Sequence, residues 1–135
     1  MKFENATRWG KTHKFRCGEL KGFVTANTEP GGAFEVFMHL DTADEGVRGL
    51  ARVLCLVVSV AVQNGVKLEK IVEKLKFQRF EPAGMTGNPE IPMCASLADY
   101  LGKWLEKEMG ITTKHAKDAK QKELATKEHE KHEKG

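Results

Sequence analysis

The sequence lacks the features that would place it in several broad classes of protein. Its three cysteines, Cys17, Cys55 and Cys94, form no Cys-x-x-Cys pair, so neither a zinc site nor a disulfide framework is indicated. We expect reduced thiols in a cytoplasmic protein. The longest apolar run, Val53–Val62, is about half a membrane span, and Met1–Gly10 does not resemble a secretory leader. We therefore expect no membrane association.

The sequence also has only a small excess of positive over negative charge. The net charge is +3, and residues 111–135, with seven lysines and five acidic residues, account for two of these three charges. Residues 1–110 are nearly neutral and show no clustered basic face, so nucleic acid is the least favoured partner class. We divide the chain into one domain, residues 1–110, and a Lys/Glu-rich tail, residues 111–135. The tail is predicted to be disordered or a solvated helix.

Three segments are predicted to be strands of a small antiparallel sheet: Lys14–Cys17, Gly22–Thr28 and Phe34–Leu40. Glu29–Gly32 contains proline and two glycines, which predicts a hairpin between the second and third strands. Alternate residues from Phe34 to Leu40 should face the core, while Phe37 and His39 point the other way. Because this second face is partly apolar, we expect another chain to cover it.

A long central helix should follow the sheet. Thr42-x-x-Glu45 is a capping box, and the apolar residues from Val47 to Val62 predict a helix that is buried almost all round. The β-branched residues of Val53–Val62 leave a strand as the alternative. The cap and the terminating Asn64-Gly65 favour the helix.

Two amphipathic helices are expected after it. One covers Leu68–Leu75, and the other begins at Ser96-x-x-Asp99 and ends at Gly110. The Pro/Gly-rich segment Glu81–Pro92 is predicted to be an irregular loop that either binds something or packs in a fixed shape. The predicted architecture is therefore α+β, with about three antiparallel strands, a buried central helix and two amphipathic helices.

Six polar residues are candidates for a ligand-binding site: His13, Lys14, Arg79, Glu81, Asn88 and Glu90. His13 and Lys14 lie in a basic segment with aromatic neighbours, which could hold a phosphate or a base, or simply dock the N-terminal arm on the sheet. Arg79 and Glu81 could point to one side and either bind a ligand or form an ion pair that anchors the loop. No nucleophile and base are paired in a recognised pattern, so we predict no catalytic residue, metal or cofactor.

Several segments together resemble a known family. They are Thr12–Phe15, Gly22–Thr25, Phe34–Phe37 and above all Arg79–Pro92, and the likeness continues at Ser96, Asp99-Tyr100 and Trp104-Leu105. Over about residues 11–106 the chain is similar to the C-terminal TSCPD-type domain of adenosylcobalamin-dependent, class II ribonucleoside-diphosphate reductases. The catalytic barrel and the C-terminal redox cysteine pair of those enzymes are missing here. The resemblance therefore implies a stand-alone accessory domain that is not catalytic by itself.

The resemblance also implies a role linked to DNA replication, through binding a ribonucleotide reductase or a nucleotide. At Asp41–Glu45 and Cys94-Ala95 the chain lacks two cations that relatives tend to carry, which weakens an anion-binding role. The alternative is an oligomeric, virus-encoded protein that sequesters a nucleotide-like small molecule between protomers, with Arg79, Asn88 and the His13-Lys14 arm holding the phosphate and base. Phe23, Phe37 and the apolar helix offer more apolar surface than so small a domain can cover, which predicts a homo-oligomer.

Overall fold

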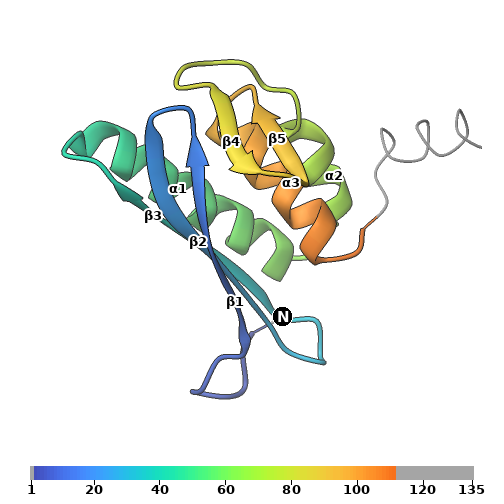
Figure 1. The fold of residues 1–135 in the computed structure, drawn as a ribbon. Helices are drawn as coiled ribbons and strands as arrows, with labels where there is room; N and C mark the ends of the chain where they lie inside the picture. Colours follow the sequence, from blue (N-terminus) through green and yellow to red (C-terminus); the bar gives the residue numbers. More distant parts are fainter. Residues whose placement is uncertain (1, 112–135) are drawn as a thin grey trace, which may run out of the picture.

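The computed structural model describes residues 2–111, which form an α+β fold (Figure 1). Its elements in chain order are β1 (Gly10–Cys17), β2 (Leu20–Thr28), β3 (Phe34–Asp41), α1 (Glu45–Gln63), α2 (Leu68–Leu75), β4 (Gly84–Asn88), β5 (Ile91–Cys94) and α3 (Leu97–Glu108). Figure 1 shows α1 behind the sheet, with α2, α3 and the β4–β5 hairpin grouped beside it. The predicted fold class is confirmed, and the predicted tail lies outside the described residues apart from its first position.

β1, β2 and β3 form one antiparallel sheet in that order. The predicted hairpin is confirmed, because the N–H of Gly32 donates a hydrogen bond to the carbonyl oxygen of Glu29 at 2.9 Å. β1 begins at Gly10 rather than at Lys14, since the basic segment before Lys14 continues in register with β2. The segment that was a candidate docking arm is thus part of the sheet.

α1 packs on the core face of β3 and also covers part of its outer edge. Alternate β3 residues from Phe34 to Leu40 are buried, as predicted. The N–H of Val36 donates to Oγ of Ser59 at 2.9 Å, and Nε2 of Gln63 donates to the carbonyl of Phe34 at 2.9 Å. Outward backbone groups of an edge strand would otherwise be open to another strand. Side chains of α1 therefore block strand addition at this part of β3.

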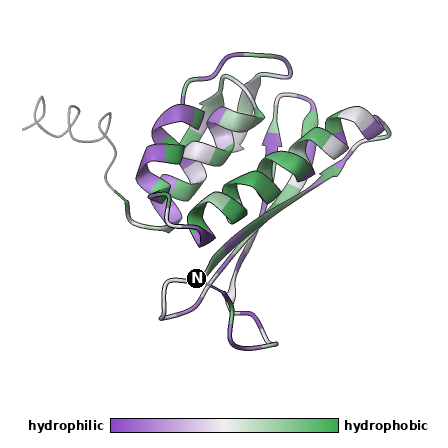
Figure 2. Ribbon diagram, turned by 180° about the vertical axis from the view of Figure 1, so that it is seen from behind, coloured by the Kyte–Doolittle hydropathy of each residue, from purple (hydrophilic) through white to green (hydrophobic). Residues whose placement is uncertain are grey.

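The helix predicted for α1 is confirmed, but its cap and its burial differ from the prediction. Asp44 caps it, with Oδ1 accepting from the N–H groups of Gly46 at 3.0 Å and Val47 at 3.2 Å. The Thr42 hydroxyl instead accepts from the N–H of Asp44. Only one face of α1 is buried, whereas Leu50 on the other face is 73% exposed. Figure 2 shows no other helix or strand of the described residues over this outer face.

α2 and α3 pack against each other and against the core. Ser96 caps α3 as predicted, since its Oγ accepts from the N–H of Asp99 at 3.0 Å, and the helix ends just before Gly110, whose φ is +60°. Lys76, at the end of α2, forms an ion pair with Glu106 of α3 at 2.8 Å. This buried contact fixes α2 beside α3.

The prediction of an irregular loop over Glu81–Pro92 is wrong for most of that segment. β4 and β5 form a two-stranded antiparallel hairpin with an irregular register. Gly84 and Gly87 have φ values of +139° and +73°, so glycine allows the chain to pass through conformations that other residues rarely adopt. The hairpin is joined to the main sheet where the N–H of Gly18 donates to the carbonyl of Met85 at 3.1 Å.

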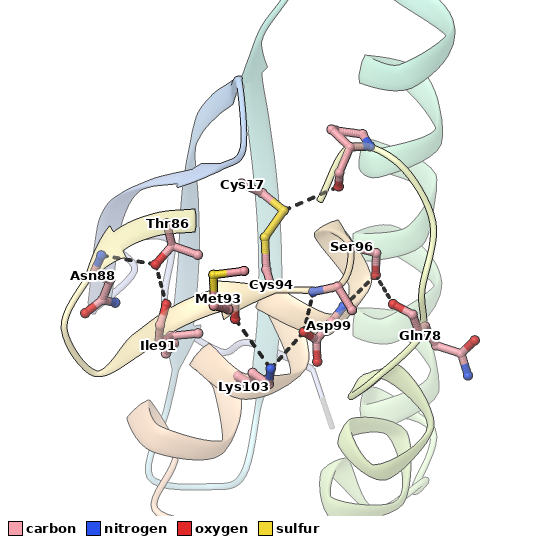
Figure 3. The surroundings of a disulfide bond; sticks show 12 residues. Cys17, Gln78, Thr86, Asn88, Ile91, Met93, Cys94, Ser96, Asp99 and Lys103 are labelled. Carbon is pink, nitrogen blue, oxygen red and sulfur yellow. Dashed lines mark hydrogen bonds and ion pairs between the residues drawn. A yellow bond between two sulfur atoms is a disulfide. The ribbon is translucent and has the colours of Figure 1, made fainter. Parts of the chain in front are cut away.

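A disulfide bond also joins the hairpin to the sheet. Cys17 at the end of β1 is bonded to Cys94 at the end of β5, so the prediction of reduced thiols is wrong for these two residues (Figure 3). Cys55 is free and buried in α1, and burial raises the pKa of its thiol to about 12. The chain segments beside the disulfide also approach each other closely, because a Cβ on Gly18 would lie 2.6 Å from the carbonyl oxygen of Ala83. The disulfide and the hydrogen bond therefore hold β4 and β5 firmly against β1.

Candidate functional site

Two of the six predicted site residues, His13 and Asn88, meet at the hydroxyl of Tyr100 on α3. Nε2 of His13 lies 2.8 Å from Oη of Tyr100, and Nδ2 of Asn88 donates to the same oxygen at 3.1 Å. The His13 ring also stacks on Trp104, with the ring centroids 5.8 Å apart. β1, β4 and α3 thus each supply a member of one polar and aromatic cluster, which we call the Tyr100 cluster: His13, Asn88, Tyr100 and Trp104.

The polar groups of the Tyr100 cluster are engaged with one another. Tyr100 is fully buried, and burial raises the pKa of its phenol above the ordinary value although the hydrogen bond from Asn88 acts in the opposite direction. The phenol therefore keeps its proton at neutral pH. Because Asn88 donates to Oη, the phenol proton is free to form the hydrogen bond with Nε2 of His13. The cluster therefore joins three elements of the fold. Its atoms are no exception in residues 2–111, where no buried side-chain nitrogen or oxygen lacks a hydrogen-bond partner.

Glu90 and Lys14 lie near the cluster but do not join it. The N–H of Glu90 donates to Oδ1 of Asn88 at 3.0 Å, and its carboxylate pairs with Lys107 of α3 at 2.9 Å. Lys14 directly follows His13 in β1, so its side chain points to the opposite face of the sheet. The sequence neighbours His13 and Lys14 therefore serve different surfaces.

Arg79 and Glu81 are exposed in the connection between α2 and β4. Within residues 2–111 they form no ion pair with each other, so of the two alternatives for these residues the anchoring ion pair is not present. The connection is anchored by its backbone instead, since the N–H of Phe80 donates to the carbonyl of Ala95 at 3.1 Å. The six candidates therefore do not converge on one site, and their roles as ligand-binding residues stay predictions.

Sequence reasoning missed the role of Asp99, a fully buried carboxylate. It accepts hydrogen bonds from the N–H groups of Phe77 at 2.6 Å and Ala95 at 2.8 Å, and from Nζ of Lys103 at 2.9 Å (Figure 3). Burial alone would raise the pKa of Asp99, but the hydrogen bonds from Ala95, Lys103 and Phe77 outweigh it and hold the pKa below the ordinary value. The capping pattern that begins at Ser96 marked this position, but gave no sign of these distant partners.

An apolar groove lies between α1 and the segment before β4. Its volume is about 400 Å³, and its lining includes Leu50 and Leu54 of α1, Phe80 and Pro82 of the connection, and Leu97 of α3. Phe80 is half exposed, and Leu50 is more exposed still. A groove with this lining can accept apolar side chains of another molecule. It has little to offer a charged ligand, because the only ionisable residue in its wall is Glu81.

The face of the sheet turned away from the helices carries a second open surface. Lys14, Phe23 and His39 lie side by side across the three strands, because Phe23 is paired with both of the others. In the neighbouring row Lys21 is paired with both Arg16 and Asp41, so this row carries two cations and one carboxylate. Phe23 is 45% exposed, so its ring is accessible next to cationic side chains. This arrangement can stack a base and attract a phosphate.

Residues 2–111 contain no group of three or more His, Cys, Asp or Glu side chains placed to hold a metal ion. They also contain no helix that is long and apolar enough to cross a lipid bilayer.

The chain matches the family model of the TSCPD domain over residues 2–109. Among curated proteins, a vitamin B12-dependent ribonucleotide reductase of Streptomyces avermitilis is 40% identical over 95 residues, which is 70% of this chain and 10% of that protein. The reductase of Rhodopirellula baltica is 36% identical over 107 residues, covering 78% of this chain and 10% of that protein. That of Agrobacterium fabrum is 33% identical over 96 residues, covering 70% and 8%. No solved structure matches.

Proposed function

This chain belongs to the TSCPD domain family and is related to the TSCPD domain of class II ribonucleotide reductases, and from this premise we propose that it is a non-catalytic accessory domain that binds such a reductase. The chain spans about a tenth of the length of the curated relatives it matches. In those relatives the matched segment is therefore covalently joined to a much larger polypeptide. We propose that this domain instead binds a surface of a reductase non-covalently.

The apolar groove between α1 and Phe80 is the observation that carries this proposal. Leu50 and Phe80 expose much of their apolar surface on its two sides, and Leu97 lies in its wall. Burial of such side chains against a partner stabilises a complex by roughly 1.5–3 kcal/mol for each large residue that is fully covered. A protein partner suits this lining better than a nucleotide does, because phosphate recognition needs cations or free N–H groups.

The Tyr100 cluster supports the non-catalytic part of the proposal. Within residues 2–111 the His13 imidazole lies within hydrogen-bond distance of a hydroxyl, but that hydroxyl belongs to the buried Tyr100 and is also bound by Asn88. A nucleophile must reach its substrate, and a general base must reach the proton it removes. Both groups of this pair instead hold β1 and β4 on α3.

Binding can be measured by immobilising the full chain and titrating purified B12-dependent reductases, including that of Streptomyces avermitilis, in biolayer interferometry. We expect Phe80→Ala to weaken binding about 10-fold to 100-fold, since one large apolar contact is lost. Met85→Ala is the matched control, because Met85 is 66% exposed on β4, outside the lining of the groove. It should bind like the wild type.

The proposed function fails if no reductase in the panel binds the wild-type chain at tens of micromolar. It also fails if Phe80→Ala and Met85→Ala bind equally well, because the groove would then not be the contact. Circular dichroism of both variants shows whether each is folded before its affinity is compared.

A second candidate function is binding of a nucleotide on the open face of the sheet. The observation that favours it is the row of Lys14, Phe23 and His39 described above, beside Arg16 and Lys21. Phe23 would stack on the base, and the lysine and arginine side chains would attract the phosphates. The Tyr100 cluster lies on the other face of the sheet and takes no part in this surface.

Isothermal calorimetry with ribonucleoside diphosphates and triphosphates tests this second candidate. If the ring stacks on a base, Phe23→Ala should weaken binding by about 1–3 kcal/mol. Phe80→Ala serves here as the control, since Phe80 lies in the groove and not on the sheet. Absence of heat with every nucleotide at millimolar concentration removes the candidate, and so does equal binding by the two variants.

A further inference from the structure

The outer face of α1 is the largest run of exposed aliphatic side chains among the described residues. We call this surface the α1 crest; its members are Leu50, Val53, Leu56, Val57 and Val60, each about half exposed or more. Figure 2 shows α1 lying uncovered across the back of the domain, and hydrophobic along most of its length. Next to the crest, a shallow groove lined by Phe37, Leu56 and Val60 extends the apolar surface onto β3. Soluble monomers rarely leave so continuous an apolar surface open to water.

The spacing of the crest fits another helix. Leu50, Val53, Val57 and Val60 follow one another at intervals of three, four and three residues, which is the spacing that forms the seam between two packed helices. Leu56 flanks the seam on the side of β3. Side chains in this pattern interdigitate with the same pattern on a facing helix.

The charges of α1 favour an antiparallel second copy of the same helix. Its charged residues, Glu45, Arg48 and Arg52, all lie in the first half, and its last turn has no basic residue. The carbonyl groups at the end of a helix carry partial negative charge. An antiparallel pair brings Arg52 of each copy toward the last turn of the other. A parallel pair would place the two Arg52 side chains beside each other.

Other parts of the chain fit this surface less well. Residues 112–135 are rich in lysine and glutamate and contain no aromatic residue, so they offer little apolar surface to cover the crest. Addition of a strand to β3 is blocked at Phe34 and Val36, whose outward backbone groups are bonded to Gln63 and Ser59. A second copy meets neither difficulty, because it supplies the same apolar seam and its own complementary charges.

We propose that two copies of this chain form a two-fold symmetric dimer in which their α1 crests pack antiparallel. In this arrangement Leu50 of each copy lies opposite Val60 of the other, and Val53 lies opposite Val57. Leu50 lies at the border of the crest and the reductase groove and is shared by both surfaces. Phe80 is outside the crest, so the variant that tests the reductase groove leaves the dimer contact unchanged.

Sedimentation velocity of the full chain between about 1 and 100 μM tests the dimer, with a dimer expected at about twice the chain mass of 15.1 kDa. Val57→Glu should raise the dissociation constant about 100-fold or more, because two unpaired carboxylates would be buried at the seam. Met85→Glu adds the same charge to an exposed site on β4 and should leave the dimer intact. A wild-type chain that stays monomeric at 100 μM overturns the proposal, as does a dimer that Val57→Glu does not weaken.

Cross-linking tests the antiparallel direction. Two versions of the chain are made, Leu50→Cys and Val60→Cys, and one of them carries a longer tag so that mixed pairs can be recognised on a gel. Ten residues of helix span about 15 Å, so in an antiparallel dimer neither version reaches its own copy, but the two reach each other. Mild oxidation should then give the mixed product only. Self-linked products from each version would show parallel helices and overturn the proposed arrangement.

Discussion

Around α3 and the β4–β5 hairpin, buried polar groups form hydrogen bonds with other parts of the domain. On the outer face of α1, by contrast, a row of apolar side chains is exposed and no other element of residues 2–111 covers it. Asp99 and Tyr100 on α3 are fully buried and each accepts or shares hydrogen bonds from other elements. The disulfide from Cys17 to Cys94 adds a covalent join on the same side. On α1 the crest has no such partners within the described residues.

This difference separates what holds the domain together from what it presents to other molecules. The polar residues selected from the sequence, such as His13 and Asn88, lie on the side around α3, where their side chains are hydrogen-bonded inside the domain; we call this the closed side. Apolar residues whose type is typical of a protein core, such as Val53 and Val57, are instead exposed on the outer face of α1, which we call the open side. If this contrast is correct, substitutions near α3 should change stability, and substitutions on the outer face of α1 should change association.

The largest effect on stability is expected from removing the disulfide. Cys94→Ser should lower the free energy of unfolding by about 4 kcal/mol, because a cross-link between residues 77 positions apart restricts the unfolded chain strongly. Urea unfolding followed by circular dichroism measures the change.

A reducing agent provides the matched control for this prediction. It should destabilise the wild type by a similar amount and should have no additional effect on Cys94→Ser. If the wild type unfolds at the same urea concentration with and without reductant, the closed side does not depend on this bond, and the comparison between the two sides weakens.

A smaller loss is expected from Asp99→Asn. The amide keeps the shape of the side chain but loses the charge that faces Lys103 and the two N–H groups, so we expect a loss of about 2–3 kcal/mol at pH 7. The pKa of Asp99 in the folded protein lies below its ordinary value. Its contribution is therefore fully present above about pH 4, the unfolded value, and is lost as the pH falls through the lower folded value.

Urea unfolding at pH 7 and at pH 3 checks both parts of this prediction. The difference between wild type and Asp99→Asn should be larger at pH 7. Glu90→Gln is the comparison variant, because the Glu90–Lys107 pair is exposed and such pairs contribute at most about 1 kcal/mol. Equal losses in the two variants would mean that burial does not distinguish these carboxylates.

The sequence predicted those parts of the fold that depend on local patterns. Alternation identified the core face of β3, and Ser96 was identified as the cap of α3. The hairpin of β4 and β5 was missed because its strands are short and depend on glycines with positive φ, which have the same composition as a loop. The Cys17–Cys94 bond was missed because an odd number of distant cysteines does not indicate which two will meet.

The candidate site was predicted in part, because the sequence supplies residue types but not their directions. Asn88 and His13 were both selected, yet Tyr100, the residue that joins them, was named as part of the family resemblance and not as a site residue. Burial of α1 was predicted from apolar content alone. Whether a helix that is apolar on both faces is covered depends on how many other elements the domain has, and within residues 2–111 none lies over the crest.

The smallest effects on the free energy of unfolding are expected from replacing two glycines by alanine. One glycine lies on α1 and the other on α3, so the pair compares the same two sides of the domain. Nothing lies within 4 Å of where a Cβ on Gly49 of α1 would be, whereas a Cβ on Gly102 of α3 would lie 3.0 Å from Cγ of Lys76 and 3.1 Å from Cβ of Leu75. Alanine favours a helix over glycine by about 1 kcal/mol. We expect Gly49→Ala to gain most of this amount, and Gly102→Ala to show a net loss of about 1 kcal/mol as α2 and α3 are forced apart.

Both glycine variants are best measured with Val57→Glu also present, so that association of α1 with another copy does not contribute to the unfolding free energy. Opposite signs would confirm that the outer face of α1 has free space while the contact between α2 and α3 has none. A gain at both positions would show that α3 can move away from α2 at little cost, and the side around α3 would then be less tightly closed than its contacts indicate.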